Sequence, residues 1–208
     1  MAVKDASVAE KRKCIGIIVY EQFETLDVFG PVQMWGRLPE HNLAIISQDG
    51  RPARSAHGIA IEPHFSFENA SNLDVLMIPG GMGARREVNN DALLAFLRTR
   101  SAEARWTTSV CTGSALLAKA GLLDGRRATS NKLAFDWATT QSPRVQWQRQ
   151  ARWVADSPFM TSSGVSAGTD LALALVEHLY DRAIAERIAK TAEYVWNDDP
   201  SSDPFALP

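Results

Sequence analysis

The chain has 208 residues, of which 45% are hydrophobic, and this length and composition suit one soluble domain with a substantial core. A formal net charge of -2 offers no general attraction to nucleic acid or to an anionic membrane surface, so we expect neither partner. The longest apolar run is much shorter than the roughly 18–20 residues that a membrane-spanning helix needs. Because the only cysteines are Cys14 and Cys111, without a CxxC pair, we expect no disulfide framework and no structural zinc site.

The N-terminus is polar and charged, with no apolar stretch of the kind found in a signal peptide. We therefore interpret residues 1–12 as a flexible leader on a cytoplasmic protein. No repeat or linker-like stretch divides the rest of the chain, so residues 13–196 are expected to form a single domain. Residues 197–208 are polar and rich in proline, and we interpret them as a tail that either wraps a neighbouring surface or stays disordered.

Between these ends, runs of apolar and β-branched residues alternate with segments of helical spacing. In chain order, the predicted elements are strand 14–20, helix 26–36, strand 42–47, a hairpin over 53–67, strand 73–81, helix 91–104, strand 105–110, helix 112–123, strand 126–131, helix 133–140, edge strands over 145–164, and helices 166–182 and 183–196. This alternation predicts an α/β fold, a flavodoxin-like three-layer sandwich with a mostly parallel sheet and helices on both faces. In such sheets, functional groups gather at the carboxyl ends of the strands.

Cys111 stands where the strand over 105–110 runs directly into the helix over 112–123. The small residues Gly113 and Ser114 follow and permit a tight turn, which is the pattern of a nucleophile elbow. The positive end of the helix dipole and its unpaired amides favour a thiolate, and cysteines at helix N-termini can have pKa values of about 3.5–7.5. The alternative is that Cys111 is a small buried hydrophobic residue, as we expect for Cys14 within its strand.

Two further features could act together with Cys111. The Gly80-Gly81 turn ends the strand over 73–81 and could supply an oxyanion-binding amide, although such a sequence is often only a turn. Asp27 follows the first strand, and beside a thiolate its pKa would rise, so that it could serve as a general acid. Asp27 could instead be a helix N-cap, and Glu24 is a rival for the acid role.

Four segments together resemble the ThiJ/PfpI superfamily, which has a class I glutamine amidotransferase-like fold. They are VYEQFETLDVFGP (19–31), LDVLMIPGG (73–81), TTSVCTGSALLAKAGLLDGRRAT (107–129) and TSSGVSAGTDLALALVEHL (161–179). The Cys-Thr-Gly-Ser elbow and the LDxxGP segment look closest to the isonitrile (isocyanide) hydratase branch. That branch is also similar to the N-terminal domains of certain transcriptional regulators.

The resemblance implies that Cys111 is the nucleophile and that Asp27 is the carboxyl hydrogen-bonded to it. Thr112 would contribute an amide or hydroxyl, Gly81 would supply the oxyanion-side amide, and the protein would be a homodimer. Two residues depart from other branches of the superfamily. Thr112 follows the cysteine where the protease-like branch has a histidine, and Asn131 stands where many relatives have another histidine. Both differences remove a base that a hydrolase would use.

The leading functional hypothesis is hydration of an isonitrile, or of a similar small carbon electrophile, to an N-substituted formamide, with no metal or organic cofactor. The alternatives are glyoxalase- or deglycase-type action on 2-oxoaldehydes and a non-enzymatic role as a cysteine redox or ligand sensor. The chain leaves no room for a helix-turn-helix pair after the α/β domain, which argues against direct DNA binding. His57 and His64 lie in the predicted hairpin and could form a metal pair, but without a defined cluster we expect no metal site.

Overall fold

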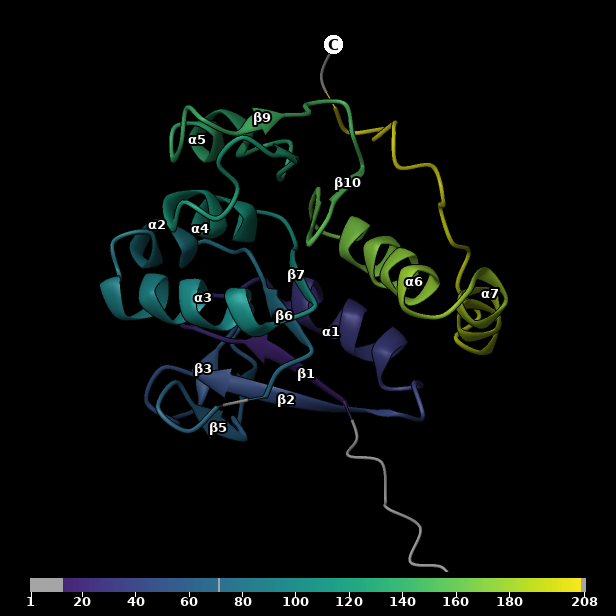
Figure 1. Ribbon diagram of the computed structural model, residues 1–208, viewed down its shortest axis with the longest axis horizontal. Helices are drawn as coiled ribbons and strands as arrows, with labels where there is room; N and C mark the ends of the chain where they lie inside the picture. Colours follow the sequence, from purple (N-terminus) through teal and green to yellow (C-terminus); the bar gives the residue numbers. More distant parts are fainter. Residues whose placement is uncertain (1–12, 71, 207–208) are drawn as a thin grey trace, which may run out of the picture.

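The structure is a computed structural model that describes residues 13–70 and 72–206, so the predicted leader lies outside the described residues. A central sheet lies between two layers of helices (Figure 1). Along the sheet the strand order is β10-β11-β7-β6-β1-β2-β5. The strands are β1 (Lys13–Ile18), β2 (His41–Ser47), β5 (Phe65–Ser66), β6 (Val75–Ile78), β7 (Trp106–Ser109), β10 (Trp153–Asp156) and β11 (Phe159–Ser162). All neighbours in this sheet are parallel except β10, which pairs antiparallel with β11 at the edge.

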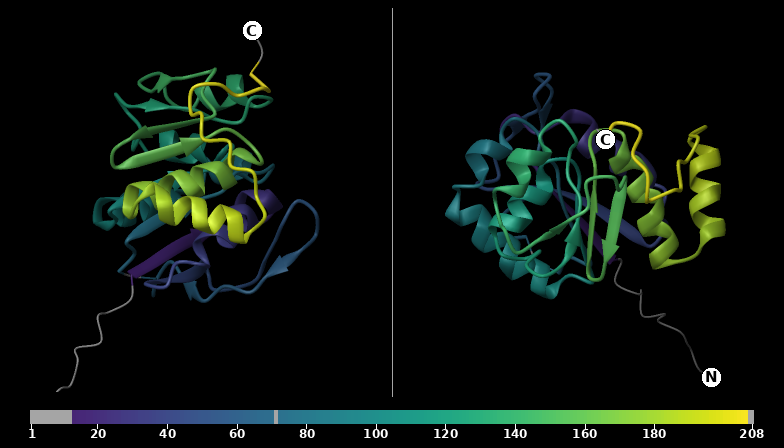
Figure 2. Two further views of the ribbon diagram at one scale, coloured as in Figure 1. Left: turned by 90° about the vertical axis from the view of Figure 1, so that its right-hand side faces the viewer. Right: turned by 90° about the horizontal axis from the view of Figure 1, so that it is seen from above.

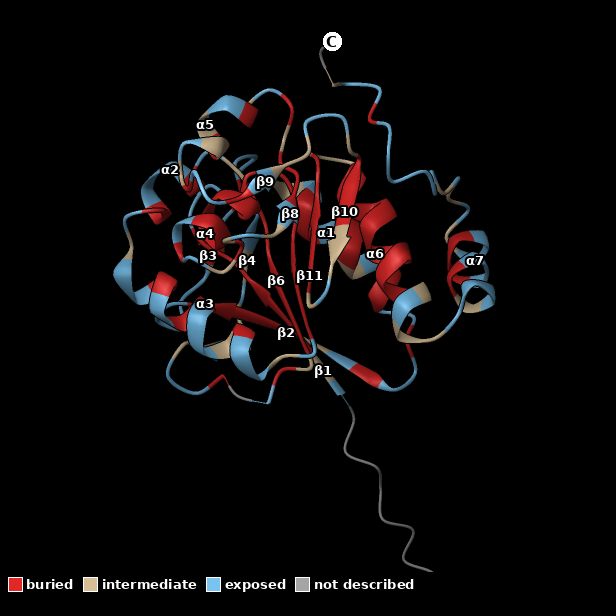
Figure 3. Ribbon diagram, turned by 45° about the horizontal axis from the view of Figure 1, so that its top comes forward, coloured by how far each residue is buried: buried red, intermediate tan, exposed pale blue. Residues whose placement is uncertain are grey.

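In β1 and β6 most residues are apolar because helices cover both faces of the sheet. Ile15 and Ile17 of β1 are fully buried, and they lie in register with Val75 and Met77 of β6. Figure 3 shows the same pattern, with buried residues along the strands and exposed ones on the outer sides of the helices. The continuous apolar runs in the sequence therefore reflect burial on both faces.

Two groups of helices form the outer layers of the sandwich (Figures 1 and 2). They are α1 (Thr25–Trp35), α6 (Ala167–Leu179) and α7 (Arg182–Thr191) on one side and α2 (Ala84–Glu87), α3 (Asp91–Glu103) and α4 (Gly113–Lys119) on the other, with α5 (Phe135–Thr139) following the second group. The indole nitrogen of Trp35 in α1 donates to the carbonyl of Ala172 in α6 at 3.0 Å, which ties these two helices together. The predicted flavodoxin-like three-layer fold is confirmed.

Two local predictions need correction, and one short helix lies outside the predicted elements. Of the segment over 53–67, only β3 (Ala53–Arg54) and β4 (Ala60–Ile61) form an antiparallel pair, whereas Phe65 and Ser66 join the main sheet as β5. In the region over 145–164, only β10 is an edge strand of the main sheet, because β11 lies between β10 and β7. The remaining strand there, β9 (Gln146–Trp147), pairs with β8 (Arg127–Ala128) in a separate two-stranded sheet. The short helix α2 was not predicted.

These corrections share a physical cause. Strands of two residues carry too little alternation to reveal their partners, and a four-residue helix shows little more than one turn of periodicity. In the part of the chain that the structure describes, no helix has both the length and the hydropathy needed to cross a membrane.

Candidate active site

Cys111 lies at a sharp turn between β7 and α4. Its φ angle is 57°, in the left-handed region that residues with a Cβ rarely adopt. The turn therefore places a strained non-glycine residue at the carboxyl end of β7. The Cys111 amide donates to the carbonyl of Ser163 at 3.2 Å, and the Gly113 amide donates to the carbonyl of Val110 at 2.9 Å. The strand–turn–helix geometry predicted around Cys111 is therefore present, although the thiol is largely enclosed, with 6% of the residue exposed.

Asp27 is brought to the same place by the first turn of α1. It is fully buried, and its Oδ2 accepts a hydrogen bond of 2.8 Å from the Gly80 amide. The other oxygen, Oδ1, has no partner of regular hydrogen-bond geometry among the described residues, but the Cys111 thiol lies near enough to lower the pKa of this carboxyl through a hydrogen bond. The N-cap position of α1 is occupied by Glu24, so the interpretation of Asp27 as a helix N-cap is wrong.

The Gly80-Gly81 turn packs directly against the elbow. A Cβ added to Gly80 would lie 2.5 Å from the Thr112 nitrogen and 2.8 Å from the Cys111 Cβ, which leaves no room for a side chain. The Gly81 amide donates to the Thr112 hydroxyl at 3.0 Å, while the Gly80 amide is engaged by Asp27. The turn thus fixes both Asp27 and Thr112 around the cysteine, and a role of its amides in binding an oxyanion stays a prediction.

The electrostatics of the cysteine differ from the expectation. Burial raises the pKa of the Cys111 thiol well above its ordinary value, and the charge of Asp27 raises it further. Hydrogen bonds from the backbone amide and the hydroxyl of Thr112 lower the pKa, but their combined effect is smaller than that of burial and Asp27. We expected the helix N-terminus to favour a thiolate at Cys111, whereas desolvation of the enclosed thiol outweighs the hydrogen bonds from Thr112 and shifts its pKa in the opposite direction.

Burial also raises the pKa of the Asp27 carboxyl well above its usual range, against the opposing hydrogen bond from Gly80. Two adjacent buried acids cannot both ionise easily, so loss of the last proton from the Cys111–Asp27 pair is disfavoured. That proton sits on sulfur or on the carboxyl. In the second arrangement the sulfur is a thiolate and the carboxyl beside it is an acid, which is the combination needed for attack followed by proton transfer.

Sequence reasoning missed the wall formed by Ser163 and Gly164, which follow β11. A Cβ on Gly164 would lie 2.9 Å from the Cys111 sulfur and even closer to the side-chain nitrogen of Asn131, so this glycine is required by close packing. This segment belongs to the stretch that resembles the ThiJ/PfpI superfamily, and it reaches Cys111 because β11 lies beside β7 in the sheet. Asn131 thus does lie at the site, with its Oδ1 accepting from the Ala134 amide at 2.9 Å.

The histidines lie outside this site. His57 Nδ1 contacts the Thr25 hydroxyl at 2.8 Å and Glu24 at 3.6 Å, and His64 Nδ1 accepts from the Ile45 amide at 2.9 Å. Within residues 13–70 and 72–206, no group of three or more His, Cys, Asp or Glu residues is arranged to hold a metal ion. His178 packs edge-on against Trp106, as expected for a packing residue.

Two cavities lie elsewhere on the molecule. One, of about 470 Å³, is lined by residues that follow β1 and β2, and the other, of about 570 Å³, lies along β10; neither includes Cys111 in its lining. Cavity size therefore does not identify the candidate site. The site is identified by the reactive and polar groups that surround Cys111. The small exposed fraction of Cys111 favours a small reactant.

Comparison with known proteins gives a consistent picture. The model of the DJ-1/PfpI family matches residues 13–178. The chain is 34% identical to an isonitrile hydratase from Pseudomonas putida over 180 residues, which are 86% of this chain and 78% of the hydratase. It is 28% identical to the HTH-type transcriptional regulator GbdR from Pseudomonas aeruginosa over 86% of this chain, and it spans half of that regulator. It is 30% identical to a deglycase from Pyrococcus abyssi over 55% of this chain and 69% of the deglycase.

Among solved structures, a ThiJ/PfpI family protein from Pseudomonas syringae is 33% identical and superposes with a TM-score of 0.79. The match covers 96% of this chain and 84% of that protein. Similarity in fold and in sequence thus extends over nearly the whole chain, including the elbow, α1 and the loop after β11.

Proposed function

Because the chain belongs to the DJ-1/PfpI family, we propose that it acts through Cys111 on a small carbon electrophile by hydrating an isonitrile to an N-substituted formamide. The observation that carries the proposal is the buried Cys111–Asp27 pair, with Asn131 rather than a histidine beside it. An isonitrile needs a nucleophile and a proton at the same carbon, and such a pair offers both. The similarity to an isonitrile hydratase supports this choice.

The reaction begins from the arrangement with a thiolate and a protonated carboxyl. The Cys111 sulfur forms a bond to the terminal carbon of the isonitrile, and Asp27 transfers its proton to that carbon, which gives a thioimidate. The Asp27 carboxylate then removes a proton from water as the hydroxide adds to the carbon, and this proton passes to nitrogen. Finally the new hydroxyl returns a proton to Asp27, the C–S bond breaks, and formamide and thiolate are released. One water is consumed, and the pair regains its starting proton.

Thr112 supports this cycle through the sulfur. Its amide and hydroxyl both lower the pKa of the Cys111 thiol, so they favour the state in which sulfur is the anion. Its hydroxyl is held in place by the Gly81 amide. The proposal therefore assigns Cys111 as the nucleophile, Asp27 as the acid and base, and Thr112 as the group that stabilises the thiolate.

The test is formation of N-substituted formamide from a simple alkyl isonitrile, followed by chromatography and mass spectrometry. We expect turnover by wild type and by Cys14→Ala, which removes the half-buried cysteine of β1, and none by Cys111→Ala. The Cys14 variant is the matched control, since it deletes the same chemical group from another part of the fold. Equal formamide formation by Cys111→Ala, or none by wild type, would contradict the proposal.

Deglycase-type action on a 2-oxoaldehyde is the second candidate, and the similarity to the Pyrococcus abyssi deglycase favours it. There the thiolate would add to the aldehyde carbon. The same three proteins incubated with methylglyoxal, without glutathione, separate the candidates, because only this activity would form lactate. A sensor role would show instead as mass gain at Cys111 with peroxide and turnover of neither compound.

We also propose that the protein is a homodimer located in the cytoplasm. Leu26 and Phe29 support the association, because both are exposed by about two fifths on α1, the helix that carries Asp27. Sedimentation of wild type and of Leu26→Lys tests it. A wild-type dimer that the lysine weakens is expected, and a monomeric wild type would contradict it.

A further inference from the structure

The C-terminal segment (residues 197–206) is fastened to the domain by backbone and side-chain contacts. The Arg152 amide donates to the Pro200 carbonyl at 2.9 Å, and the Asp203 amide donates to the Gln150 carbonyl at 2.8 Å. At the start of the segment, the Asn197 amide donates to Asp170 Oδ1 at 3.0 Å. In Figure 1 this stretch runs from α7 to the end of the molecule beside β10. Its backbone contacts thus lie at the start of β10 and at the residues just before that strand.

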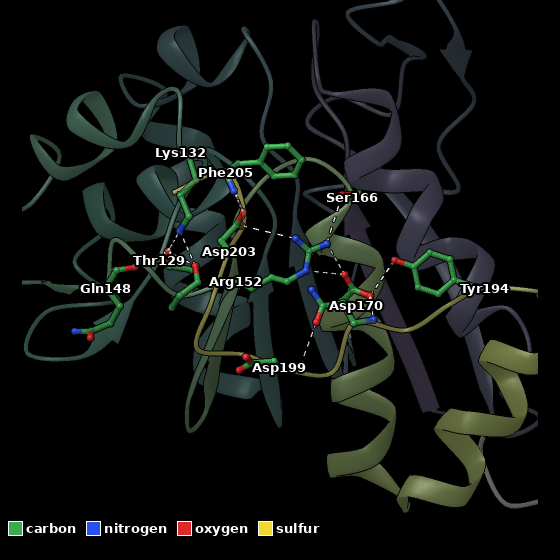
Figure 4. A network of polar contacts seen from close by, with 12 residues as sticks. Thr129, Lys132, Gln148, Arg152, Ser166, Asp170, Tyr194, Asp199, Asp203 and Phe205 are labelled. Atoms are coloured by element: carbon green, nitrogen blue, oxygen red, sulfur yellow. Dashed lines mark hydrogen bonds and ion pairs between the residues drawn. The ribbon is translucent and has the colours of Figure 1, made fainter. Parts of the chain in front are cut away.

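Buried charges lie beneath this segment (Figure 4). Arg152 is 5% exposed and donates to Asp170 Oδ2 from Nε at 2.8 Å and from Nη2 at 2.5 Å. Its remaining nitrogen, Nη1, faces Asp203 Oδ2 at 3.9 Å, and neither atom has a hydrogen-bond partner among the described residues. The nearby Lys132 ammonium donates to the Ala151 carbonyl at 2.6 Å. Two cations and two anions are therefore enclosed together, and Asp203 is the one that the C-terminal segment supplies.

The same segment is connected to the active site by a ladder of backbone hydrogen bonds. From Pro200 the ladder passes to Arg152, whose carbonyl accepts from the Ser163 amide at 2.8 Å. The Ser163 carbonyl in turn accepts from the Cys111 amide at 3.2 Å. Gly164, the next residue, packs against the Cys111 sulfur. Every step from the C-terminal segment to the cysteine is therefore a direct contact.

We propose that Asp203 and Arg152 are positioning residues, which hold the Ser163–Gly164 wall against Cys111 by fastening the C-terminal segment over β10. A buried ion pair contributes little net stability, because the desolvation of its charges offsets their attraction. It does, however, fix one arrangement of the groups that it joins. Arg152 connects three parts of the structure. Its guanidinium contacts Asp170 of α6 and Asp203 of the C-terminal segment, and its backbone belongs to the hydrogen-bond ladder. The inference rests on the proposed function only in naming the reaction that the positioning serves.

Lys132 gives a second connection to the site. It follows Asn131, whose side chain meets Gly164. Burial lowers the pKa of Lys132 to about 8, and the carboxylate of Asp203 opposes this shift. Loss of the Asp203 charge would leave both buried cations less compensated. The disturbance would therefore reach the Cys111 site from the Arg152 side and from the Asn131 side.

The test is Asp203→Asn, which keeps the size of the side chain and the Oδ1 acceptor for the Phe205 amide but removes the charge facing Arg152. The matched control is Asp198→Asn, the same substitution in the same segment at an exposed carboxylate that pairs with Arg182. A chain ending at Asp199 serves as a second variant, because it removes both Pro200 and Asp203.

Two readouts are measured: amide hydrogen exchange by NMR, and the kinetics of formamide formation. We expect the Cys111 and Ser163 amides to exchange about tenfold faster in Asp203→Asn and in the shortened chain, while β1 and β6 amides keep their protection. We expect kcat to fall about tenfold with KM within about twofold, because a misplaced nucleophile slows chemistry more than binding. The Asp198→Asn control should match wild type in both.

The outcomes separate this inference from the proposed function. Unchanged exchange of Cys111 and Ser163 in folded variants would overturn the positioning role, even if wild type forms formamide. Uniformly faster exchange, including β1 and β6, would also overturn it, since that result indicates a general loss of stability. Faster exchange confined to the ladder would support it, even if wild type were inactive toward isonitriles.

Discussion

Replacing Arg152 with methionine tests how strongly the buried charges contribute to folding. The substitution preserves much of the apolar stem but leaves Asp170, which is fully buried, and Asp203, which is 4% exposed, without the guanidinium that faces both. Removing one partner of a buried ion pair typically costs about 3–5 kcal/mol. For a chain of this length, each kcal/mol lowers Tm by about 2–4 °C. We therefore expect a decrease of about 6–20 °C.

The assay is thermal unfolding followed by circular dichroism, with urea unfolding to obtain the free energy. Arg182→Met is the matched control, because Arg182 also pairs with more than one carboxylate (Glu177, Glu186 and Asp198) but is half exposed. Exposed ion pairs contribute little, so we expect no measurable change in Tm for this control. If the two variants shifted Tm equally, or if Arg152→Met cost less than about 1 kcal/mol, burial would not be the source of the effect.

Three further predictions concern the site and its surroundings. Gly80→Ala places a Cβ against the Thr112 backbone and should destabilise the fold by about 1–3 kcal/mol, measured by urea unfolding; an unchanged midpoint would contradict the packing argument. Thr112→Val removes the hydroxyl that lowers the pKa of Cys111, so alkylation of the thiol at pH 8 should slow, and an unchanged or faster rate would exclude this role. Lys132 binds its proton less tightly in the folded protein, where its pKa is about 8 rather than 10.5. The free energy of unfolding of wild type relative to Lys132→Met should therefore rise as pH increases between these two values. A difference that does not change with pH would refute this prediction.

The layered fold and the elbow could be predicted from the sequence because both depend on local patterns. The apolar run of β1 and the junction of β7 with α4 at Cys111 are visible along the chain without knowledge of strand order. The Gly80-Gly81 turn was predicted to lie near the cysteine because both follow parallel strands. The structure shows that turn in contact with Cys111 and with Asp27.

Other features required the three-dimensional arrangement. The sequence does not show that β11 neighbours β7, so it could not place Ser163 and Gly164 against the sulfur. Nor does it show how deeply Cys111 is enclosed, and this enclosure reverses the expected direction of its pKa. The contacts of Asp203 were equally hidden, since they join residues about fifty positions apart in the chain.

The central claim is that Cys111 and Asp27 share one proton, and the pH dependence of Cys111 alkylation tests it most directly. The measurement compares Asp27→Asn with wild type, both carrying Cys14→Ala so that only one thiol reacts. In the pair, the last proton leaves against the repulsion of two buried anions, whereas the amide of asparagine carries no charge. The alkaline rise in rate should therefore occur at lower pH in Asp27→Asn than with aspartate present. Identical profiles, or a shift to higher pH, would contradict the account.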